Sequence, residues 1–499
     1  MTPLFARTRE RQRGLRLWHV WVVLPLAFIA ALTVAGGVFY AGWDLLGARG
    51  LKAQPRIDSK TLFDLVKLSF GVVAGAGGLV ALIVAYRRQR VDEDGALRDA
   101  TRLHSERFTV AVSQLGDASA AVRLGGVHSL AHLADDAPTR GLRQTCIDVL
   151  CAYLRLPYTA ESDLPPGDTA ARHEYLALQQ VRHTVIRLIR DHLRLDLEHT
   201  HSWRDYSFAF TSVVFDGGDF TGAHFHGTVS FDGAEFSGGT VDFDGARFSG
   251  GTVSFDGAEF SGGTVDFDGA RFSGGTVSFD GAEFSGGTVS FSIAEFSGGT
   301  VSFRNAQFNG GTVSFRNAQF NGGTVFFHNA QFNGGTVSFR NAQFNGGTVF
   351  LGNARFSSGT VSFDGAEFSG GTVSFSIAQF SGGTVSFRNA QFNGGTVFFG
   401  GAQFNGGTVP FDGAQFSGGT VDFRIAQFSG GTVFFRNAQF SGGTALFGNA
   451  EFSSGTVDFD SAEFNGGTVD FAGALGVAPS GLPSSGGPLP AGVTLADAW

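Results

Sequence analysis

A twelve-residue repeat governs about half of this 499-residue chain. Threonine recurs every twelve residues from Thr228 to Thr468, which makes 21 repeats, and the consensus is G-T-V-S-F-x-x-A-x-F-S-G. The composition follows from it, because Gly 75 and Phe 55 are both far above ordinary usage. A short fixed period is the signature of a solenoid, in which each repeat buries its apolar face against its neighbours. The repeat therefore argues against an ordinary globular enzyme.

Alternation within one repeat separates inner from outer side chains. Successive side chains of a strand point to opposite faces, so Val253 and Phe255 share one side, as do Ala258 and Phe260. These positions hardly vary between repeats, whereas the others vary among Ser, Asp, Glu, Arg, Gln and Asn. Glycine and asparagine at the junctions suit corners that need positive φ. We therefore predict a β-solenoid over residues 208–472.

A five-residue spacing marks the entry to this segment, at Phe210, Phe215, Phe220 and Phe225. Together with the pattern A/D-x-F-x-G it resembles the pentapeptide-repeat family. The resemblance implies a right-handed four-sided β-helix in which the central Leu or Phe, and the small residue two before it, point inward. The pairs Ala258/Phe260 and Val253/Phe255 match these roles. The chain departs from the family pattern because its inward Phe residues alternate five and seven apart, which lengthens every second corner.

The repeat is compatible with two coil lengths, a 24-residue coil and a 12-residue coil. A 12-residue coil must hold two Phe rings per level in a narrow tube, whereas a 24-residue coil has four sides with one Phe each. In the shorter coil Glu235 and Arg247 would stack favourably; in the longer one Glu235 stacks on Glu259. Exposed charge pairs contribute at most about 1 kcal/mol, and a misplaced Phe costs about 3–5 kcal/mol. We therefore predict 24-residue coils.

Two apolar stretches precede the repeat, at 20–41 and 68–86. Each is free of charge and long enough to cross a bilayer, so the sequence predicts a membrane hairpin over residues 1–90. Ten Arg residues flank the hairpin, against five Arg and Lys in its loop, which places both termini in the cytoplasm by the positive-inside rule. A bacterial multi-pass membrane protein with a cytoplasmic solenoid is expected. This arrangement also resembles actinobacterial membrane-anchored pentapeptide-repeat-containing proteins.

The remaining segments are a connector and a tail. Residues 91–207 show helical periodicity, and we predict a small helical connector with Arg182, Arg187, Arg190 and Arg194 facing water. Residues 473–499 are rich in Pro, Gly and Ser and are predicted to be a disordered tail. The fold class is thus α plus all-β: two transmembrane helices, the connector and the solenoid.

Catalytic and cofactor signals are weak. His128 and His132 are four residues apart, but two ligands are too few for a metal site. Cys146 and Cys151 are expected to be free core thiols. A tube filled with Phe has no interior pocket for convergent polar groups. We therefore expect no enzyme activity, no cofactor and no metal.

The function favoured by these features is a non-catalytic membrane-anchored scaffold or protein-interaction module. Its partners are the lipid bilayer and an unidentified protein, with self-association as a further option and no direct nucleic acid. The family resemblance implies an alternative, a DNA mimic that binds type II topoisomerases. Residues 225–472 carry 20 Asp plus Glu and 9 Arg, but no acid occurs from Gln307 to Ser362, where three Arg residues interrupt the acidic field.

A candidate interaction stripe occupies the outward position after Val. Ser or Asp stands there in most repeats, but five repeats carry large apolar residues. Positions that differ by a multiple of 24 share a wall, which selects four of the five: Phe326, Phe350, Phe398 and Leu446. Isolated exposed apolar residues are ordinary on protein surfaces, whereas an aligned set is typical of a docking site. We predict that this stripe contacts a partner or a second copy.

Overall fold

The computed structural model describes most of the chain after residue 57. The residues described are 25, 26, 28–30, 33, 36, 37, 40, 41, 44, 58–159, 161, 164–482, 489, 491–497 and 499. The chain divides into two compact units, Met1–Leu103 and His104–Trp499. The second unit contains the connector helices and the solenoid.

The expected pair of transmembrane helices is wrong for the part of the chain that the structure describes. Of the helices described there, none is long and apolar enough to cross a membrane. The apolar stretch 68–86 is a middle section of α2 (Ser59–Leu115), which continues without a break into the charged segment that begins at Arg87. The stretch is therefore not a separate element with ends of its own. Most of the other stretch, 20–41, lies outside the described residues.

Three further helices precede the solenoid: α3 (Ala120–Asp135), α4 (Arg140–Leu154) and α5 (Thr169–Arg194). Side-chain caps begin two of them, since Thr139 accepts a hydrogen bond from the Leu142 N–H and Asp168 from the Ala170 and Ala171 N–H groups. Helix α5 is amphipathic, and its apolar face is buried in the core that continues into the solenoid.

Arg182 on α5 is an exception to the expected water-facing series. It is 3% exposed, and its guanidinium donates to the backbone carbonyls of Leu154 and Val214. It also lies 4.2 Å from the ring centroid of Tyr158. Periodicity alone missed this because a long charged side chain can be buried wherever backbone acceptors satisfy its donors.

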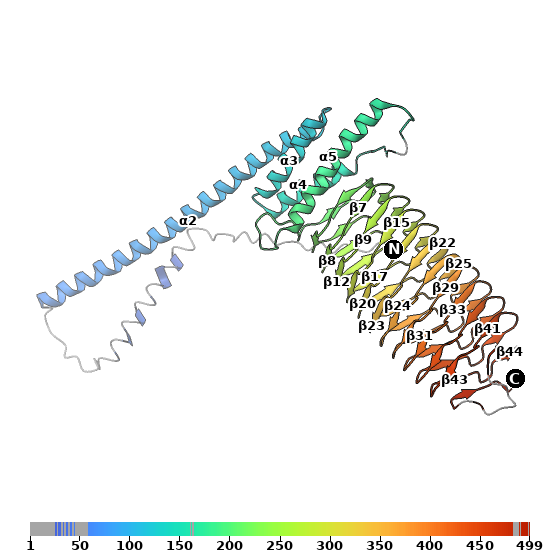
Figure 1. Cartoon of the computed structure of the whole chain (residues 1–499). Coiled ribbons are helices and arrows are strands. Elements are labelled where there is room, and N and C mark those ends of the chain that lie inside the picture. Colours follow the sequence, from blue (N-terminus) through green and yellow to red (C-terminus); the bar gives the residue numbers. More distant parts are fainter. Residues whose placement is uncertain are drawn as a thin grey trace. The chain divides into compact units, whose positions relative to one another are not determined.

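The solenoid consists of stacked coils (Figure 1), most of which have four short strands; in two coils a single longer strand, β22 (Gln331–Ser338) or β25 (Arg355–Ser362), takes the place of two. One coil contains β9 (Thr252–Ser254), β10 (Glu259–Phe260), β11 (Thr264–Asp266) and β12 (Arg271–Ser273). Every paired strand runs parallel to its partner in the next coil. We call the four sides the first to fourth walls in this order. The first wall is a 13-stranded sheet, the second and third form a 21-stranded sheet, and the fourth is an 11-stranded sheet.

The first wall is the one that carries the predicted stripe. The fourth runs from β4 (His224–Phe225) to β42 (Glu463–Phe464). The strands of the first wall, in order, are β1 (Phe208–Ala209), β5 (Val229–Ser230), β9, β13 (Thr276–Ser278), β17 (Thr300–Ser302), β21 (Thr324–Phe326), β24 (Thr348–Phe350), β27 (Thr372–Ser374), β31 (Thr396–Phe398), β35 (Thr420–Asp422), β39 (Thr444–Leu446), β43 (Thr468–Asp470) and β45 (Val493–Thr494).

The strand register gives the length of one coil. Glu259 pairs with Glu235 on one side and with Glu283 on the other, and Val253 pairs with Val277. The 24-residue coil is therefore confirmed, and the 12-residue alternative is wrong. Like charges stack along the second wall as a result.

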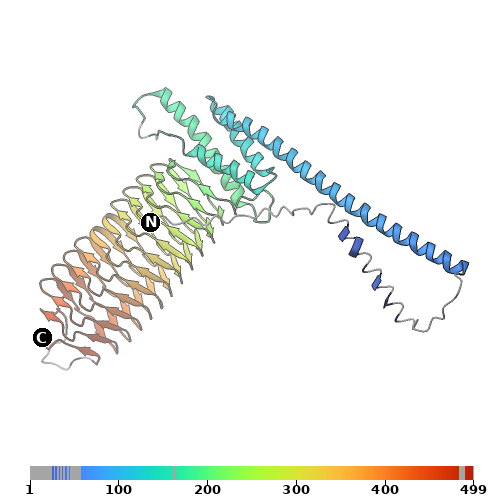
Figure 2. The same cartoon turned by 180° about the vertical axis from the view of Figure 1, so that it is seen from behind.

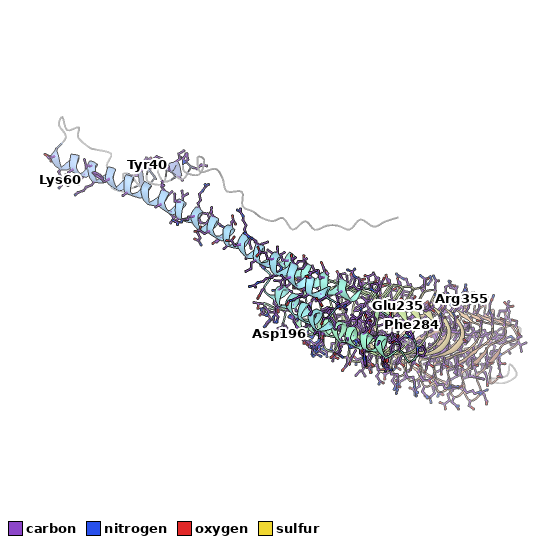
Figure 3. The ribbon with its side chains drawn as sticks, turned by 90° about the horizontal axis from the view of Figure 1, so that it is seen from above. Tyr40, Lys60, Asp196, Glu235, Phe284 and Arg355 are labelled. Carbon is purple, nitrogen blue, oxygen red and sulfur yellow. The ribbon has the colours of Figure 1, made fainter. Side chains whose placement is uncertain are left out.

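The interior is filled by the residues that alternation assigned to it. Val253, Phe255, Ala258 and Phe260 are all at most 2% exposed. Each inward ring stacks on its equivalent in the next coil; for example, Phe255 and Phe279 have centroids 4.6 Å apart and planes within 4°. Among the residues labelled in Figure 3, Glu235 and Arg355 are exposed and Phe284 is 1% exposed.

The corners bring successive coils into backbone contact. Gly239 has φ 61°, and a Cβ there would lie 2.1 Å from the carbonyl oxygen of Asp216 in the coil below. Only glycine fits such an approach. At other corners asparagine adopts the left-handed conformation, and Asn353 donates through Nδ2 to Oδ1 of Asn329 at 2.7 Å.

Both ends of the solenoid are covered. At the start, α4 contacts β1 and α5 contacts β3 (Gly218–Asp219), and the views from both sides show these helices beside the first coils (Figures 1 and 2). At the other end, the Trp499 ring packs 5.3 Å from Phe471 and its Nε1 donates to the Gly476 carbonyl. The described residues of 473–499, expected to be disordered, thus include an added strand, β45, and a cap.

Removing one inward ring tests the stacked core. Phe255→Ala is expected to lower the free energy of unfolding by about 3–5 kcal/mol, because it deletes a buried ring from a column that cannot collapse. Guanidinium denaturation followed by circular dichroism measures the change. The control Glu259→Gln alters an exposed side chain of the same coil and should shift stability by less than about 0.5 kcal/mol. Equal effects of the two changes would contradict the inward assignment.

Candidate interaction surface

The four predicted stripe residues lie in one outward column of the first wall. Phe326 pairs in register with Phe350, which pairs with Ser374, and Ser374 with Phe398. Asp422 separates Phe398 from Leu446. The structure therefore places all four on the same wall, as an interrupted series.

Two rings of the column are in direct contact. Phe326 and Phe350 stack with centroids 5.2 Å apart and planes within 10°. The Arg304 guanidinium lies over the Phe326 ring at 4.0 Å, whereas Phe350 is 36% exposed. Phe350 is thus the open member of the pair.

The polar interruption at Asp422 is neutralised within the wall. Asp422 is 4% exposed, and its carboxylate accepts from Nε of Arg424 at 2.9 Å. The wall therefore presents no free carboxylate between Phe398 and Leu446.

Phe434, which the 24-residue rule excluded from the stripe, lies on a different wall. It belongs to β37 (Thr432–Phe434) and pairs in register with Pro410 of β33 (Thr408–Pro410), in the 21-stranded sheet. Arg436 covers its ring at 4.0 Å and forms an ion pair with Asp458 at 2.7 Å. Phe434 is a natural control for the stripe.

Three exposed isoleucines lie at corners of the solenoid. The sequence analysis did not single out these residues. Ile293, Ile377 and Ile425 have φ between 53° and 57° and are 56–62% exposed. A β-branched residue in the left-handed region costs about 1–2 kcal/mol. The signal was present in the sequence, because the same position carries Gly, Asn or Ser in every other repeat.

Two of these isoleucines extend the stripe. Ile377 and Ile425 follow β27 and β35, at the corner between the first and second walls. A Cβ on Gly401 would lie 3.3 Å from Cγ2 of Ile377 and 4.0 Å from Cδ1 of Ile425, so the two side chains flank this glycine. We call the combined surface the apolar face; it consists of Phe326, Phe350, Ile377, Phe398, Ile425 and Leu446.

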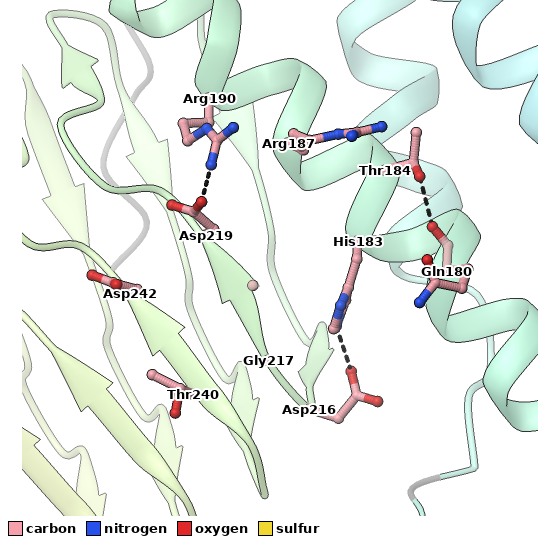
Figure 4. A pocket seen from close by; sticks show the side chains of 11 residues that line it. Gln180, His183, Thr184, Arg187, Arg190, Asp216, Gly217, Asp219, Thr240 and Asp242 are labelled. Atoms are coloured by element: carbon pink, nitrogen blue, oxygen red, sulfur yellow. Dashed lines mark hydrogen bonds and ion pairs between the residues drawn. The ribbon is translucent and has the colours of Figure 1, made fainter.

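A second feature is a cleft of about 550 Å³ between α5 and the first coils (Figure 4). Helix α5 lines one side with polar residues, and the coils supply Asp216, Asp219, Thr240 and Asp242. Arg190 forms an ion pair with Asp219, as Figure 4 shows. This ion pair therefore neutralises part of the charge that lines the cleft.

Asp216 ties the helical segment to the solenoid. Its carboxylate accepts hydrogen bonds from the hydroxyls of Tyr158 and Tyr175 and from Nε2 of Gln179, and Nε2 of His183 lies 3.5 Å away. Burial by itself raises the pKa of Asp216, but these hydrogen bonds outweigh it and hold the pKa well below its ordinary value. Asp216 therefore stays ionised, and its carboxylate oxygens hold the helical segment against the solenoid.

Two further groups of the helical segment, on α5 and α4, have raised pKa values. Burial, together with the Asp216 carboxylate, raises the pKa of Tyr175 to about 12. Burial likewise raises the pKa of Cys146 to about 11. Among the residues that the structure describes, no three His, Cys, Asp or Glu side chains are grouped to hold a metal ion.

Replacing a strained isoleucine tests whether the left-handed backbone conformation at this corner lowers stability. Ile377→Asn should raise the free energy of unfolding by about 1 kcal/mol, because asparagine tolerates the left-handed conformation and occupies the same corner at Asn353. The control Ile377→Val keeps the β-branch and should bring no gain. Denaturant titration measures both; a destabilised Asn variant would show that Ile377 stabilises the corner.

Acid titration tests the role of Asp216. Its folded-state pKa lies below the ordinary 3.8, so its contribution is present above about pH 4 and is lost as the pH falls toward the folded-state value. Asp216→Asn should therefore cost about 2 kcal/mol at pH 7, and the gap to the wild type should shrink below pH 4. A gap that stays constant down to pH 2 would contradict this role. Asp242→Asn, at a carboxylate of the same cleft that accepts from the Asp244 N–H, should cost less at pH 7.

Comparison with known proteins bears on the solenoid. The sequence model of the family described as Pentapeptide repeats (9 copies) matches residues 210–253. No curated protein and no solved structure matches the chain. The matched residues include the Phe series at five-residue spacing and form the first coils of the solenoid. The resemblance to pentapeptide repeats is therefore confirmed over residues 210–253.

Proposed function

We propose that this chain is a non-catalytic protein-interaction module whose solenoid presents the apolar face to a protein partner. The observation that supports this most is the in-register alignment of Phe326, Phe350, Phe398 and Leu446 on one wall. The interior contributes rigidity alone, because its side chains fill it.

Burial of the apolar face by a protein partner is energetically favourable. Fully burying a Phe, Ile or Leu side chain contributes about 1.5–3 kcal/mol, and Phe350, Ile377 and Ile425 are each more than a third exposed. Ile377 and Ile425 also carry the backbone cost of their corners. Residues that cost local stability and remain exposed are typical of a site selected for contact.

A triple substitution tests the proposal. Changing Phe326, Phe350 and Phe398 to Ser, the commonest residue at this position, should leave the circular dichroism spectrum unchanged. Quantitative affinity capture with the full chain as bait should then recover the proteins held by the wild type at least tenfold less well. Phe434→Ser, on another wall, is the matched control and should recover them equally. Undiminished recovery by the triple variant would refute the role of the apolar face.

The acidic second wall supplies the competing outcome. Glu235, Glu259 and Glu283 stack in register there, and a DNA mimic would bind through such carboxylates. Recovery of a type II topoisomerase that survives the Phe changes, but is lost when these three residues become Gln, would replace our proposal with that alternative.

A further inference from the structure

Side chains at the corners of the solenoid bond to the outward strand residue of the next coil, 22 residues further along the chain. Where the corner residue is Asp and the strand residue above it is Ser, the serine hydroxyl donates to the Asp carboxylate. This pairing occurs in four places: Ser278 on Asp256, Ser290 on Asp268, Ser302 on Asp280 and Ser386 on Asp364. In each, the same carboxylate oxygen also accepts the backbone N–H of the next corner residue in its column. One Asp oxygen therefore satisfies two donors.

The reverse arrangement of charge is also satisfied within the chain. Arg436 is a corner residue, and Asp458 is the outward strand residue above it. Nε of Arg436 donates to the Asp458 carboxylate at 2.7 Å. A corner that carries either charge can thus pair a donor with an acceptor.

At the corner residue Arg316 both members of the pair are donors. Ser338, the last residue of β22, lies above Arg316 and is 7% exposed, yet its Oγ has no hydrogen-bond partner among the described residues. A guanidinium cannot accept a hydrogen bond, so Arg316 cannot replace the Asp oxygen. The N–H of Arg340, the next corner residue, lacks the same carboxylate. A buried hydroxyl without a partner is costly, which makes this an unusual place in a folded chain.

The next coil repeats the arrangement. Ser362 lies above Arg340 and is also 7% exposed. Its Oγ accepts from the Asp364 N–H at 3.2 Å, and no described residue accepts the proton of its hydroxyl. Two successive coils therefore share an excess of donors at the corner between the third and fourth walls.

The chain supplies no carboxylate for these donors. Residues 307–362 contain no Asp or Glu. The first acid after this segment is Asp364, and its Oδ1 is already used by Ser386 and the next corner N–H. Arg316 and Arg340 are both exposed. The ion pairs described within the solenoid are formed by other arginines, namely Arg271, Arg388, Arg424 and Arg436.

We propose that Arg316, Ser338 and Arg340 bind a carboxylate from outside the chain. An oxygen of the ligand takes the position that an Asp oxygen holds at the equivalent corners, where it accepts from the Ser338 hydroxyl and the Arg340 N–H. The two guanidinium groups supply the opposite charge and further donors. Ser362 offers a second position one coil away, so a ligand with several carboxylates should bind more tightly than one with a single carboxylate.

This position can be reached from solvent. The Asp residues that fill it elsewhere are themselves exposed or partly exposed: Asp256, Asp268, Asp280 and Asp364. A carboxylate therefore gains access to Ser338 when the exposed Arg316 side chain moves aside. The site uses no residue of the apolar face, so it adds a second binding surface to the proposed function and does not depend on it.

Fluorescence anisotropy with a labelled tetra-aspartate peptide and the purified full chain, at constant ionic strength, tests the proposal. The wild type should bind the peptide. Arg316→Asp supplies the missing carboxylate from within the chain, so it should stay folded by circular dichroism yet weaken binding at least tenfold. The matched control Arg355→Asp makes the same change of charge on the second wall and should weaken binding far less. Equal weakening by the two changes, or no binding by the wild type, would overturn the proposal.

Two competitors identify the source of the ligand. If sodium acetate displaces the peptide at an equal concentration of carboxylate, small acids are sufficient ligands; if displacement requires a large excess, the site selects an acidic peptide segment. A single-stranded DNA oligonucleotide that binds more tightly than the peptide, and is lost in Arg316→Asp, would replace the carboxylate with phosphate and overturn the assignment.

A stability measurement tests the unpartnered hydroxyl by itself. Ser338→Ala should leave the denaturation midpoint of the free chain unchanged or higher, because the hydroxyl has no partner to lose, and it should weaken peptide binding severalfold without a change of charge. Ser386→Ala is the control, because it deletes the bond to Asp364 and should lower the midpoint. Equal losses of stability, or unchanged binding by Ser338→Ala, would overturn the proposal. Neither experiment involves the apolar face, so either failure leaves the proposed function intact.

Discussion

Stacking between inward phenylalanine rings is the interaction on which this solenoid depends. Equivalent rings of successive coils lie nearly parallel, as in Phe267 on Phe291 at 4.8 Å and 3°. Within one coil, Phe255 and Phe267 meet edge to face at 5.8 Å and 87°. Columns of stacked rings tied across by perpendicular contacts favour a single coil spacing and a single register. The straight outer columns, including the stripe, are a consequence of this order inside.

The corners show what the close coil spacing demands. Backbone contact at positions such as Gly239 excludes any side chain, and asparagine ladders satisfy their own amides from coil to coil. Against this background, isoleucine at left-handed corners is locally unfavourable. The core repeat therefore does not determine every residue of the outer surface. At Ile377 and Ile425 the chain carries isoleucine where the corner conformation favours glycine or asparagine.

Much of the solenoid was predictable from the sequence because its signal is periodic. Alternation identified Val253 and Phe255 as inward, and the cost of misplacing Phe identified the 24-residue coil. Features that do not repeat could not be predicted from periodicity. Trp499 caps the far end of the solenoid although it lies in a segment of low-complexity composition. Arg182 is buried because the backbone carbonyls of Leu154 and Val214 accept its hydrogen bonds. For the site, the stripe followed from spacing alone, whereas Ile377 and Ile425 required the φ angles. The transmembrane expectation rested on local hydropathy, which does not reveal that residues 68–86 lie inside a 57-residue helix.

The difference between the repeat of 12 and the coil of 24 has a consequence for how such a gene can change. Gain or loss of a single repeat leaves the inward pattern intact, because both halves of a coil carry the same core residues. It nevertheless moves every later outer residue to the opposite wall. An insertion between Phe350 and Phe398 would split the apolar face between two sides of the tube without disturbing its core. Duplications that preserve the surface must therefore come in pairs of repeats, so unequal recombination within this segment produces two classes of progeny: odd changes that fold but lose the face, and even changes that keep it.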